Sequence, residues 1–213
     1  MPTDLKPNST KIYQRQSYQS NFITKYYWDF RDKVIMSFIN DKHRNILDAG
    51  CGEGLLLEKL IKKYPEKNIK GLDIIEENIK ICHEHNLPAS VGSLYQLADA
   101  EKYDLCILSE VIEHLENPDL ALNNIKKILK PSGELLIVFP NDGAMKIAEL
   151  LLFKFKNAFA DWGHLRKYSP KSLKKILRDN GYEAEKTMSI PFNFWALDSH
   201  GIVLASKKDA LNA

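Results

Sequence analysis

One short run of residues pairs an acid with three alternating glycines and is well suited to bind a ligand. It reads Asp48-Ala49-Gly50-Cys51-Gly52-Glu53-Gly54. Glycine at alternate positions lets the backbone turn sharply and lets a ligand come closer than a Cβ would allow. Apolar residues 46–47 precede this glycine loop, and an amphipathic stretch, 55–64, follows it. A strand, a glycine loop and a helix start are typical of a nucleotide-binding corner, although a tight turn without a ligand has the same pattern.

A second acidic residue lies at the position where nucleotide-binding folds of this kind place a ribose-binding carboxylate. Asp73 lies in the apolar segment 69–74, at about the 20-residue distance from the glycine loop at which a carboxylate can bind the two hydroxyls of a ribose. Nicotinamide-dependent dehydrogenases share that feature, so the glycine spacing must discriminate. Asp-x-Gly-x-Gly-x-Gly differs from the G-x-G-x-x-G of a pyrophosphate loop, and no lysine follows the last glycine as in a P-loop. The pattern favours neither a dinucleotide nor a nucleoside triphosphate.

The remaining chain alternates apolar and amphipathic segments. We expect strands over 46–49, 69–74, 89–91, 103–109, 134–139, 183–190 and 201–206. We expect helices over 12–40, with Tyr27 in its apolar stripe, and over 55–64, 76–85, 118–129 and 171–180. This alternation predicts an α/β fold with a mostly parallel sheet and an antiparallel strand at the end.

The domain organisation follows from the length of 213 residues, which suits one domain with embellishments. We predict that residues 1–41 form an N-terminal helical lid. Residues 42–213 then form the ligand-binding domain, with an insertion at 142–168 on the acceptor side.

The composition and charge of the chain indicate which partners and which cellular compartment to expect. The net charge is only +2 and no basic patch stands out, so a nucleic-acid partner is not favoured. No apolar run approaches the roughly 18 residues of a membrane span, and residues 1–7 lack a signal-peptide core. Three widely spaced cysteines favour reduced thiols. We therefore expect a cytoplasmic protein.

Four motifs in order resemble the class I S-adenosylmethionine-dependent methyltransferases, with a resemblance that covers about residues 44–207. They are the segment 46–54, Gly71-Leu72-Asp73, the strand 103–109 and the turn at 129–135. The resemblance implies a Rossmann-like seven-stranded sheet, mostly parallel, with helices on both faces and an antiparallel last strand. It also implies S-adenosylmethionine as the cofactor and a small molecule as the methyl acceptor. This cofactor has no phosphates, which agrees with a loop that is not built to bind them.

The same resemblance assigns the cofactor site. It implies contacts from Asp48, Gly50, Cys51, Gly52, Gly54, Asp73, Ile74, Ser93, Leu94 and Ser109. Many relatives place an acid after the third strand to bind the adenine amine, but residues 91–94 read Val-Gly-Ser-Leu here. We expect Ser93 or its backbone to take that place.

Glu110, Glu113 and His114 directly follow the fourth predicted strand, at i, i+3 and i+4. On a helix they would share one face and could bind a divalent cation. Glu-x-x-Glu-His resembles a metal-binding motif of small-RNA 3′-terminal 2′-O-methyltransferases, in which a downstream histidine completes the site, and a similar sequence occurs in ubiquinone-pathway O-methyltransferases. His164 is the candidate for that histidine. The same letters also begin a metal-free helix across the superfamily, and that is the interpretation we favour.

The acceptor side is expected near residues 161–169, which resemble an H-x-R-x-F/Y-S/T stretch of many small-molecule methyltransferases. A neutral imidazole suits a general base near pH 7, so His164 is a catalytic candidate, although it could instead be structural. Glu110, directly after the fourth predicted strand, is the second catalytic candidate. The candidate substrate-binding residues are Tyr18, Trp162, Arg166 and Tyr168. The apolar, lysine-containing stretch 143–160 would form a lid over the acceptor or a helix at a membrane surface.

We therefore predict methyl transfer from S-adenosylmethionine to a small molecule, at a hydroxyl oxygen. The enzymatic alternatives are metal-assisted 2′-O-methylation of an RNA end and methylation of a quinone-like lipid. A cofactor-binding regulator without catalysis is the alternative of another class.

Overall fold

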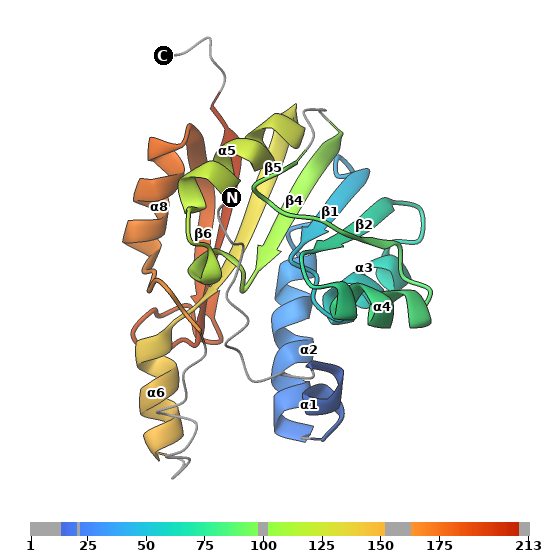
Figure 1. Ribbon diagram of the computed structural model, residues 1–213. Coiled ribbons are helices and arrows are strands. Elements are labelled where there is room, and N and C mark those ends of the chain that lie inside the picture. Colours follow the sequence, from blue (N-terminus) through green and yellow to red (C-terminus); the bar gives the residue numbers. More distant parts are fainter. Residues whose placement is uncertain (1–13, 21, 98–101, 152–162, 209–213) are drawn as a thin grey trace.

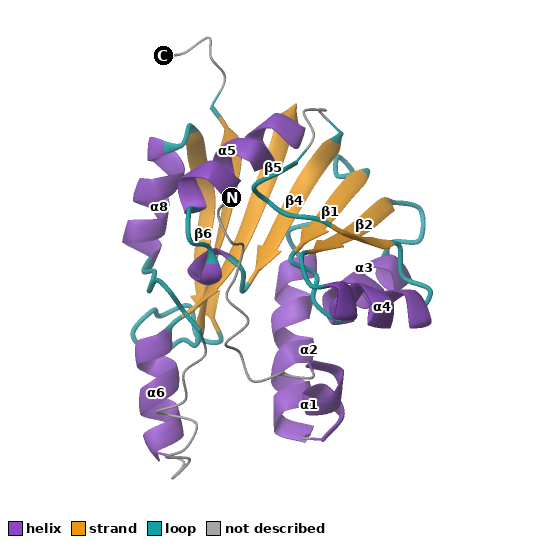
Figure 2. Ribbon diagram, viewed as in Figure 1, coloured by secondary structure: helices purple, strands orange, loops and turns teal. Residues whose placement is uncertain are grey.

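A seven-stranded sheet with helices on both faces forms the fold (Figures 1 and 2). The computed structural model describes residues 14–20, 22–97, 102–151 and 163–208. The strands are β1 (Asn45–Ala49), β2 (Asn68–Asp73), β3 (Ala89–Val91), β4 (Tyr103–Ser109), β5 (Leu129–Pro140), β6 (Tyr182–Ile190) and β7 (His200–Lys207). Their order is β3-β2-β1-β4-β5-β7-β6; β7 pairs antiparallel with both β5 and β6, and the other pairs are parallel. The predicted α/β fold with an antiparallel last strand is confirmed.

Most helices lie where the sequence places them. They are α1 (Gln14–Ser20), α2 (Phe22–Met36), α3 (Leu55–Lys63), α4 (Glu76–Glu84), α5 (Pro118–Ile128), α6 (Asp142–Leu151) and α8 (Pro170–Asp179), with a 3₁₀ turn, η1 (Ile112–His114). The one long helix expected over 12–40 is instead two helices, α1 and α2. Both extend, as α6 does, from one end of the sheet (Figure 1).

Two apolar clusters, one on each face, hold the helices to the sheet. On one face α5 and α8 contribute side chains such as Leu122 and Leu177 to a cluster that also contains Cys106 and Leu108 of β4. On the other, α2 and α3 pack on the alternate residues of the central strands. Because β4 is buried on both faces, its sequence is almost continuously apolar. None of the described helices combines the length and the apolarity that crossing a membrane requires.

Asp104 ties together the starts of three strands at the edge opposite the glycine loop. One of its carboxylate oxygens accepts hydrogen bonds from the main-chain N–H of Arg44 (3.0 Å) and of Asn45 (2.7 Å). The other accepts from Lys130 Nζ at 2.7 Å. Partial burial acts to raise the pKa of this carboxyl, but the hydrogen bonds from Lys130 and Asn45 outweigh burial and hold the pKa below its ordinary value.

We predict that Asp104→Asn lowers the free energy of unfolding by about 1–2 kcal/mol near neutral pH, because it removes a charge-assisted acceptor. A depressed carboxyl pKa stabilises the fold above the ordinary pKa of aspartate and loses this effect as pH falls through the folded value. Urea unfolding in neutral and in acidic buffer should therefore show the difference only in the first. Asp179→Asn, which removes an exposed partner of Lys175, is the control and should change little. An equal effect from both variants would contradict the prediction.

Candidate active site

The strand order reverses between β1 and β4, and the loops that follow these two strands flank the site. Ligands of open α/β sheets bind in the crevice at such a point. Gly50, Gly52 and Gly54 have φ values of 82°, 54° and 78°, a region that glycine enters without the strain of a Cβ. A Cβ on Gly50 would also overlap the side chain of Val111, which follows β4. The glycine loop and the end of β4 are therefore in direct contact.

Asp73 fixes the glycine loop from the end of β2. One carboxylate oxygen accepts from the N–H of Gly52 at 2.8 Å, and the other accepts from the N–H of Ile75 at 2.9 Å. The first helix covers the same loop from the other side. Gln14 Oε1 accepts from the N–H of Glu53 (3.2 Å), and Arg15 Nε donates to the carbonyl of Glu53 (2.9 Å). Sequence reasoning missed this contribution of α1.

Asp48 is a buried acid whose second carboxylate oxygen has no hydrogen-bond partner among the described residues. Burial raises the pKa of Asp48 to about 7, and the charges of Asp32 and Asp73 add to the rise. A buried carboxylate without compensation is unfavourable. The site therefore suits a ligand that brings a cationic group, such as an ammonium, to Asp48.

The other predicted cofactor residues also lie at this edge of the sheet. Cys51 is buried in the glycine loop, and its thiol shares the carbonyl of Gly52 with the thiol of Cys82. Ser109 ends β4, and Ser93 Oγ accepts from the N–H of Tyr95 at 3.1 Å. Ile74 follows β2, and Leu94 is buried just beyond β3. Their contacts with a cofactor remain predictions.

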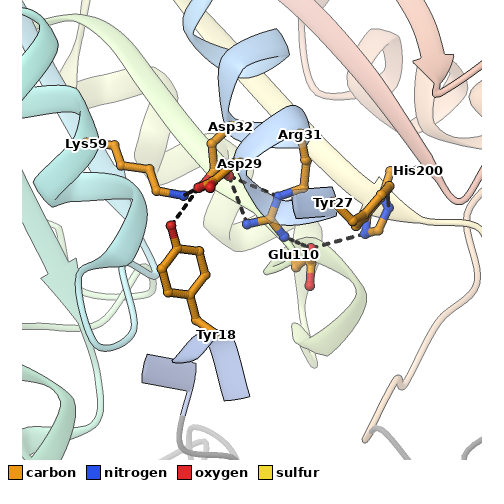
Figure 3. Close-up of polar contacts among 8 residues, drawn as sticks. All are labelled: Tyr18, Tyr27, Asp29, Arg31, Asp32, Lys59, Glu110 and His200. Atoms are coloured by element: carbon orange, nitrogen blue, oxygen red, sulfur yellow. Dashed lines mark hydrogen bonds and ion pairs between the residues drawn. The ribbon is translucent and has the colours of Figure 1, made fainter. Parts of the chain in front are cut away.

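Glu110, directly after β4, is held by two basic side chains (Figure 3). Its Oε1 accepts from Arg31 Nη1 of α2 and from His200 Nε2 of β7, the latter at 3.1 Å. His200 Nδ1 is in turn 2.6 Å from the hydroxyl of Tyr27, which also bonds Ser199. Burial acts to raise the pKa of Glu110, but the charge of Arg31 and the bond from His200 outweigh it and hold the pKa far below its ordinary value.

The same network continues into the N-terminal helices (Figure 3). Arg31 donates to Asp32 at 3.0–3.1 Å, and Lys59 of α3 joins Asp32 (2.7 Å) to Asp29 (2.6 Å). Tyr18 of α1, a predicted substrate-binding residue, donates to Asp29 at 2.7 Å. Its hydroxyl is thus engaged with α2.

The expected alignment of Glu110 with Glu113 and His114 is wrong. It assumed a helix, but only Ile112–His114 form a 3₁₀ turn, and Glu110 has a left-handed backbone with φ of 57°. The N–H of Glu110 bonds the carbonyl of Val138 at 2.9 Å and so continues the pairing of β4 with β5. Glu110 therefore points toward α2 and β7.

Glu113, His114 and His164 come together instead, with one ligand atom from each lying within 4.8 Å of the others. The main-chain carbonyl of Glu113 accepts from the N–H groups of Leu165 (2.9 Å) and Arg166 (3.2 Å), which brings His164 beside His114. Glu113 is 1% exposed, and neither carboxylate oxygen has a hydrogen-bond partner among the described residues. Burial, with the charge of Glu110, raises the pKa of Glu113 well above its ordinary value.

Both imidazoles of this Glu113–His114–His164 cluster are oriented through Nδ1. His164 Nδ1 lies 2.8 Å from a carboxylate oxygen of Asp142, and His114 Nδ1 lies 3.0 Å from the carbonyl of Gly163. Both partners can only accept, so each Nδ1 carries the hydrogen. In a neutral ring this leaves Nε2 with a free lone pair, which suits either a base or a metal ligand.

The predicted substrate-binding residues have different surroundings. Arg166 donates to the main-chain carbonyls of Leu115 and Glu116, so its guanidinium anchors the turn after η1. The hydroxyl of Tyr168 is buried without a hydrogen-bond partner among the described residues. Trp162 lies outside the described residues, as does the part of the 143–160 stretch beyond α6.

Sequence reasoning also missed Arg31, Asp142 and His200, and it placed Tyr27 in the apolar stripe of the predicted lid without a hydrogen-bonding role. Tyr27 and Arg31 are four residues apart on α2, a spacing that puts both on one helix face and was an available signal. His200 and Asp142 carry no local motif. They reach the site only because β7 starts, and α6 begins, beside the end of β5.

A glycine loop and an acid at the switch point of a sheet with this strand order define the class I S-adenosylmethionine-dependent methyltransferase fold. Residues 19–187 match the family model of a methyltransferase domain, and the chain belongs to this family.

Two named relatives share about the same level of identity. The mitochondrial ubiquinone biosynthesis O-methyltransferase of Mus musculus is 31% identical over 165 residues, which cover 70% of this chain and 44% of that protein. The ubiquinone biosynthesis O-methyltransferase of Bartonella bacilliformis is 28% identical over 183 residues, covering 76% and 72%. The chain thus spans less than half the length of the mouse relative and of its rat counterpart.

Solved structures show the same fold at lower identity. A SAM-dependent methyltransferase from Archaeoglobus fulgidus has a TM-score of 0.69 at 19% identity, covering 92% of this chain and 100% of that one. The magnesium protoporphyrin IX methyltransferase of Synechocystis, solved with SAH bound, has a TM-score of 0.65 at 22% identity, covering 92% and 93%.

Asp48 provides a test of the cofactor site. Its pKa is raised on folding, so the folded state loses stability as pH rises from the ordinary aspartate value to about 7. We predict that Asp48→Asn increases the free energy of unfolding by a few kcal/mol in mildly alkaline buffer and weakens S-adenosylmethionine binding roughly tenfold or more. Thermal unfolding and isothermal titration measure the two effects.

Asp198 is the matched control, because it is also fully buried but accepts a hydrogen bond from Phe192 N–H at 2.6 Å. Asp198→Asn should therefore lower stability. A loss of stability in both variants would contradict the conclusion that the charge of Asp48 is uncompensated in the folded protein.

Proposed function

We propose that this protein transfers a methyl group from S-adenosylmethionine to a hydroxyl oxygen of a small organic molecule. The observation that carries the proposal is the pairing of the glycine loop and Asp48 with an oriented histidine, His164, on the acceptor side. The relatives named as ubiquinone biosynthesis O-methyltransferases support oxygen as the methylated atom and a quinone-type ring as the acceptor.

The reaction requires mainly position and one proton transfer. The glycine loop, Asp48 and Asp73 would hold the cofactor, Asp48 at its ammonium and Asp73 at its ribose hydroxyls. The acceptor oxygen forms a bond to the methyl carbon as the carbon–sulfur bond breaks, and the electron pair stays on sulfur. The hydroxyl proton passes to Nε2 of His164, and the charge of Asp142 stabilises the resulting imidazolium.

The N-terminal helices serve as the lid in this proposal. Gln14 and Arg15 rest on the glycine loop, so α1 would have to move for the cofactor to enter. The ion pairs of Lys59 with Asp29 and Asp32 hold the lid in place. On the opposite side of the acceptor, α6 supplies Asp142.

We predict turnover with S-adenosylmethionine and one or more of three probes: phenol, 1,2-dihydroxybenzene and a primary alcohol. Release of S-adenosylhomocysteine and mass spectrometry of the product measure it. His164→Ala should reduce kcat by about 100-fold or more, the usual contribution of a general base, and leave the Kd of S-adenosylhomocysteine unchanged.

His85→Ala is the control, because His85 lies exposed at the end of α4, and it should keep full activity. A His164→Ala variant with full kcat would rule out the base. Cofactor binding without turnover on any probe would favour the non-catalytic regulator.

A second candidate function is transfer assisted by a divalent metal, and the buried, unpartnered carboxylate of Glu113 favours it. Glu113, His114 and His164 would hold the ion, with Asp142 and the Gly163 carbonyl orienting the imidazoles from behind. One carboxylate and two imidazoles are a donor set that suits Mn²⁺ and similar ions. Such an ion would lower the pKa of an acceptor hydroxyl and orient its oxygen.

Binding of Mn²⁺ tests this candidate without an activity assay. We predict one site per chain by isothermal titration, lost in Glu113→Gln and weakened about 10- to 100-fold in Asp142→Asn, which acts through His164. Glu116→Gln is the control, because Glu116 is exposed nearby, and it should bind Mn²⁺ normally. Failure of the unaltered protein to bind Mn²⁺ would exclude metal-assisted transfer.

A further inference from the structure

Glu110 lies beside the glycine loop, where the proposed function brings the methyl donor and acceptor together. It directly follows β4, and the next residue, Val111, packs against Gly50 of the glycine loop. The Glu110 side chain is 38% exposed, whereas the side chains of Arg31 and His200 that hold it are 10% and 5% exposed. Both of these bonds go to Oε1. Oε2 makes no hydrogen bond in the described part of the chain and is not buried.

The partners of Glu110 make it an acceptor of hydrogen bonds rather than a base. Arg31 and His200 keep the carboxylate ionised, so it does not take up a proton near neutral pH. Arg31 also compensates its charge. This matters because a sulfonium loses its positive charge during methyl transfer, and an uncompensated carboxylate beside it would stabilise the ground state more than the transition state.

His200 sets the direction in which Glu110 points. A carboxylate only accepts, so His200 Nε2 carries the hydrogen that is donated to Oε1. The ring is fixed at its other nitrogen by the hydroxyl of Tyr27, 2.6 Å from Nδ1, and its faces are buried. The hydrogen bonds that link Tyr27, His200 and Glu110 therefore join α2, β7 and the end of β4 (Figure 3).

We propose that His200, supported by Tyr27, is a positioning residue that aims Oε2 of Glu110 at the hydroxyl group of the methyl acceptor. This inference rests on the proposed methyl transfer. Before transfer, Oε2 accepts a hydrogen bond from the acceptor O–H and directs the oxygen toward the methyl carbon. The O–H then turns to Nε2 of His164, which takes the proton. Loss of the bond from His200 should weaken acceptor binding and leave cofactor binding intact.

Two substitutions of His200 separate the two ring nitrogens. Glutamine can place an amide N–H near the position of Nε2 and keep the bond to Glu110. Asparagine reaches only the position of Nδ1 and keeps the contact with Tyr27. We expect His200→Asn to raise the KM for the phenolic probe roughly tenfold or more, the effect of losing a hydrogen bond to a charged group. His200→Gln should stay near the original KM, and the Kd of S-adenosylhomocysteine should not change in either.

His43→Gln is the matched control, because His43 is a buried histidine bonded to a glutamate (Glu134, 2.7 Å) at the opposite edge of the sheet. It should change stability but not KM. Tyr27→Phe provides a second measurement should His200→Asn fail to fold, and it should raise KM in the same direction. Equal KM values for the two His200 variants, or an unchanged KM in Tyr27→Phe, would overturn this inference but not the proposed function. No turnover by the unaltered protein would overturn the proposed function and this inference with it.

Discussion

Repulsion among carboxylates is the constraint on which the site depends. The ends of the parallel strands and the adjoining helices bring acids to one edge of the sheet, namely Asp32, Asp48, Asp73, Glu110 and Glu113. Arg31 and Lys59 compensate those nearest to α2. Asp48 and Glu113 stay buried with unpartnered oxygens, and the neighbouring acids raise the pKa of each beyond the effect of burial. Each is a place where a cation would relieve the repulsion.

The compensating cations also explain why the N-terminal helices belong to the site. Arg31 is almost fully buried between Asp32 and Glu110. Removing Arg31 would leave the negative charge of either acid uncompensated. Lys59 does the same for Asp29 and Asp32 from α3. Docking of α2 is therefore coupled to the ionisation of the acids at the sheet edge. A hinged lid attached only by apolar contacts would have no such coupling.

The sequence predicted the fold well because its signals are local. The glycine spacing, the acid at the end of β2 and the apolar strand β4 each depend on a few neighbouring residues. The acceptor side depends on contacts between distant segments. Glu110 was expected beside Glu113, but one left-handed residue turns it toward His200, which lies 90 positions away. Asp142 pairs with His164 across 22 positions. No spacing rule on one helix or strand could reveal these pairs.

His164 links the two candidate functions through a single atom. Asp142 holds its Nδ1, so only the Nε2 lone pair remains for chemistry. That lone pair can accept a proton or bind a metal ion, but not both at once. If a metal ion occupies the Glu113–His114–His164 cluster, His164 cannot take the hydroxyl proton of the acceptor. Glu110 cannot replace it as a base, because Arg31 and His200 hold its pKa far below the ordinary value. The acceptor would then have to lose its proton to solvent, which a metal ion makes feasible by lowering the pKa of the hydroxyl. General-base and metal-assisted transfer are therefore exclusive at this site.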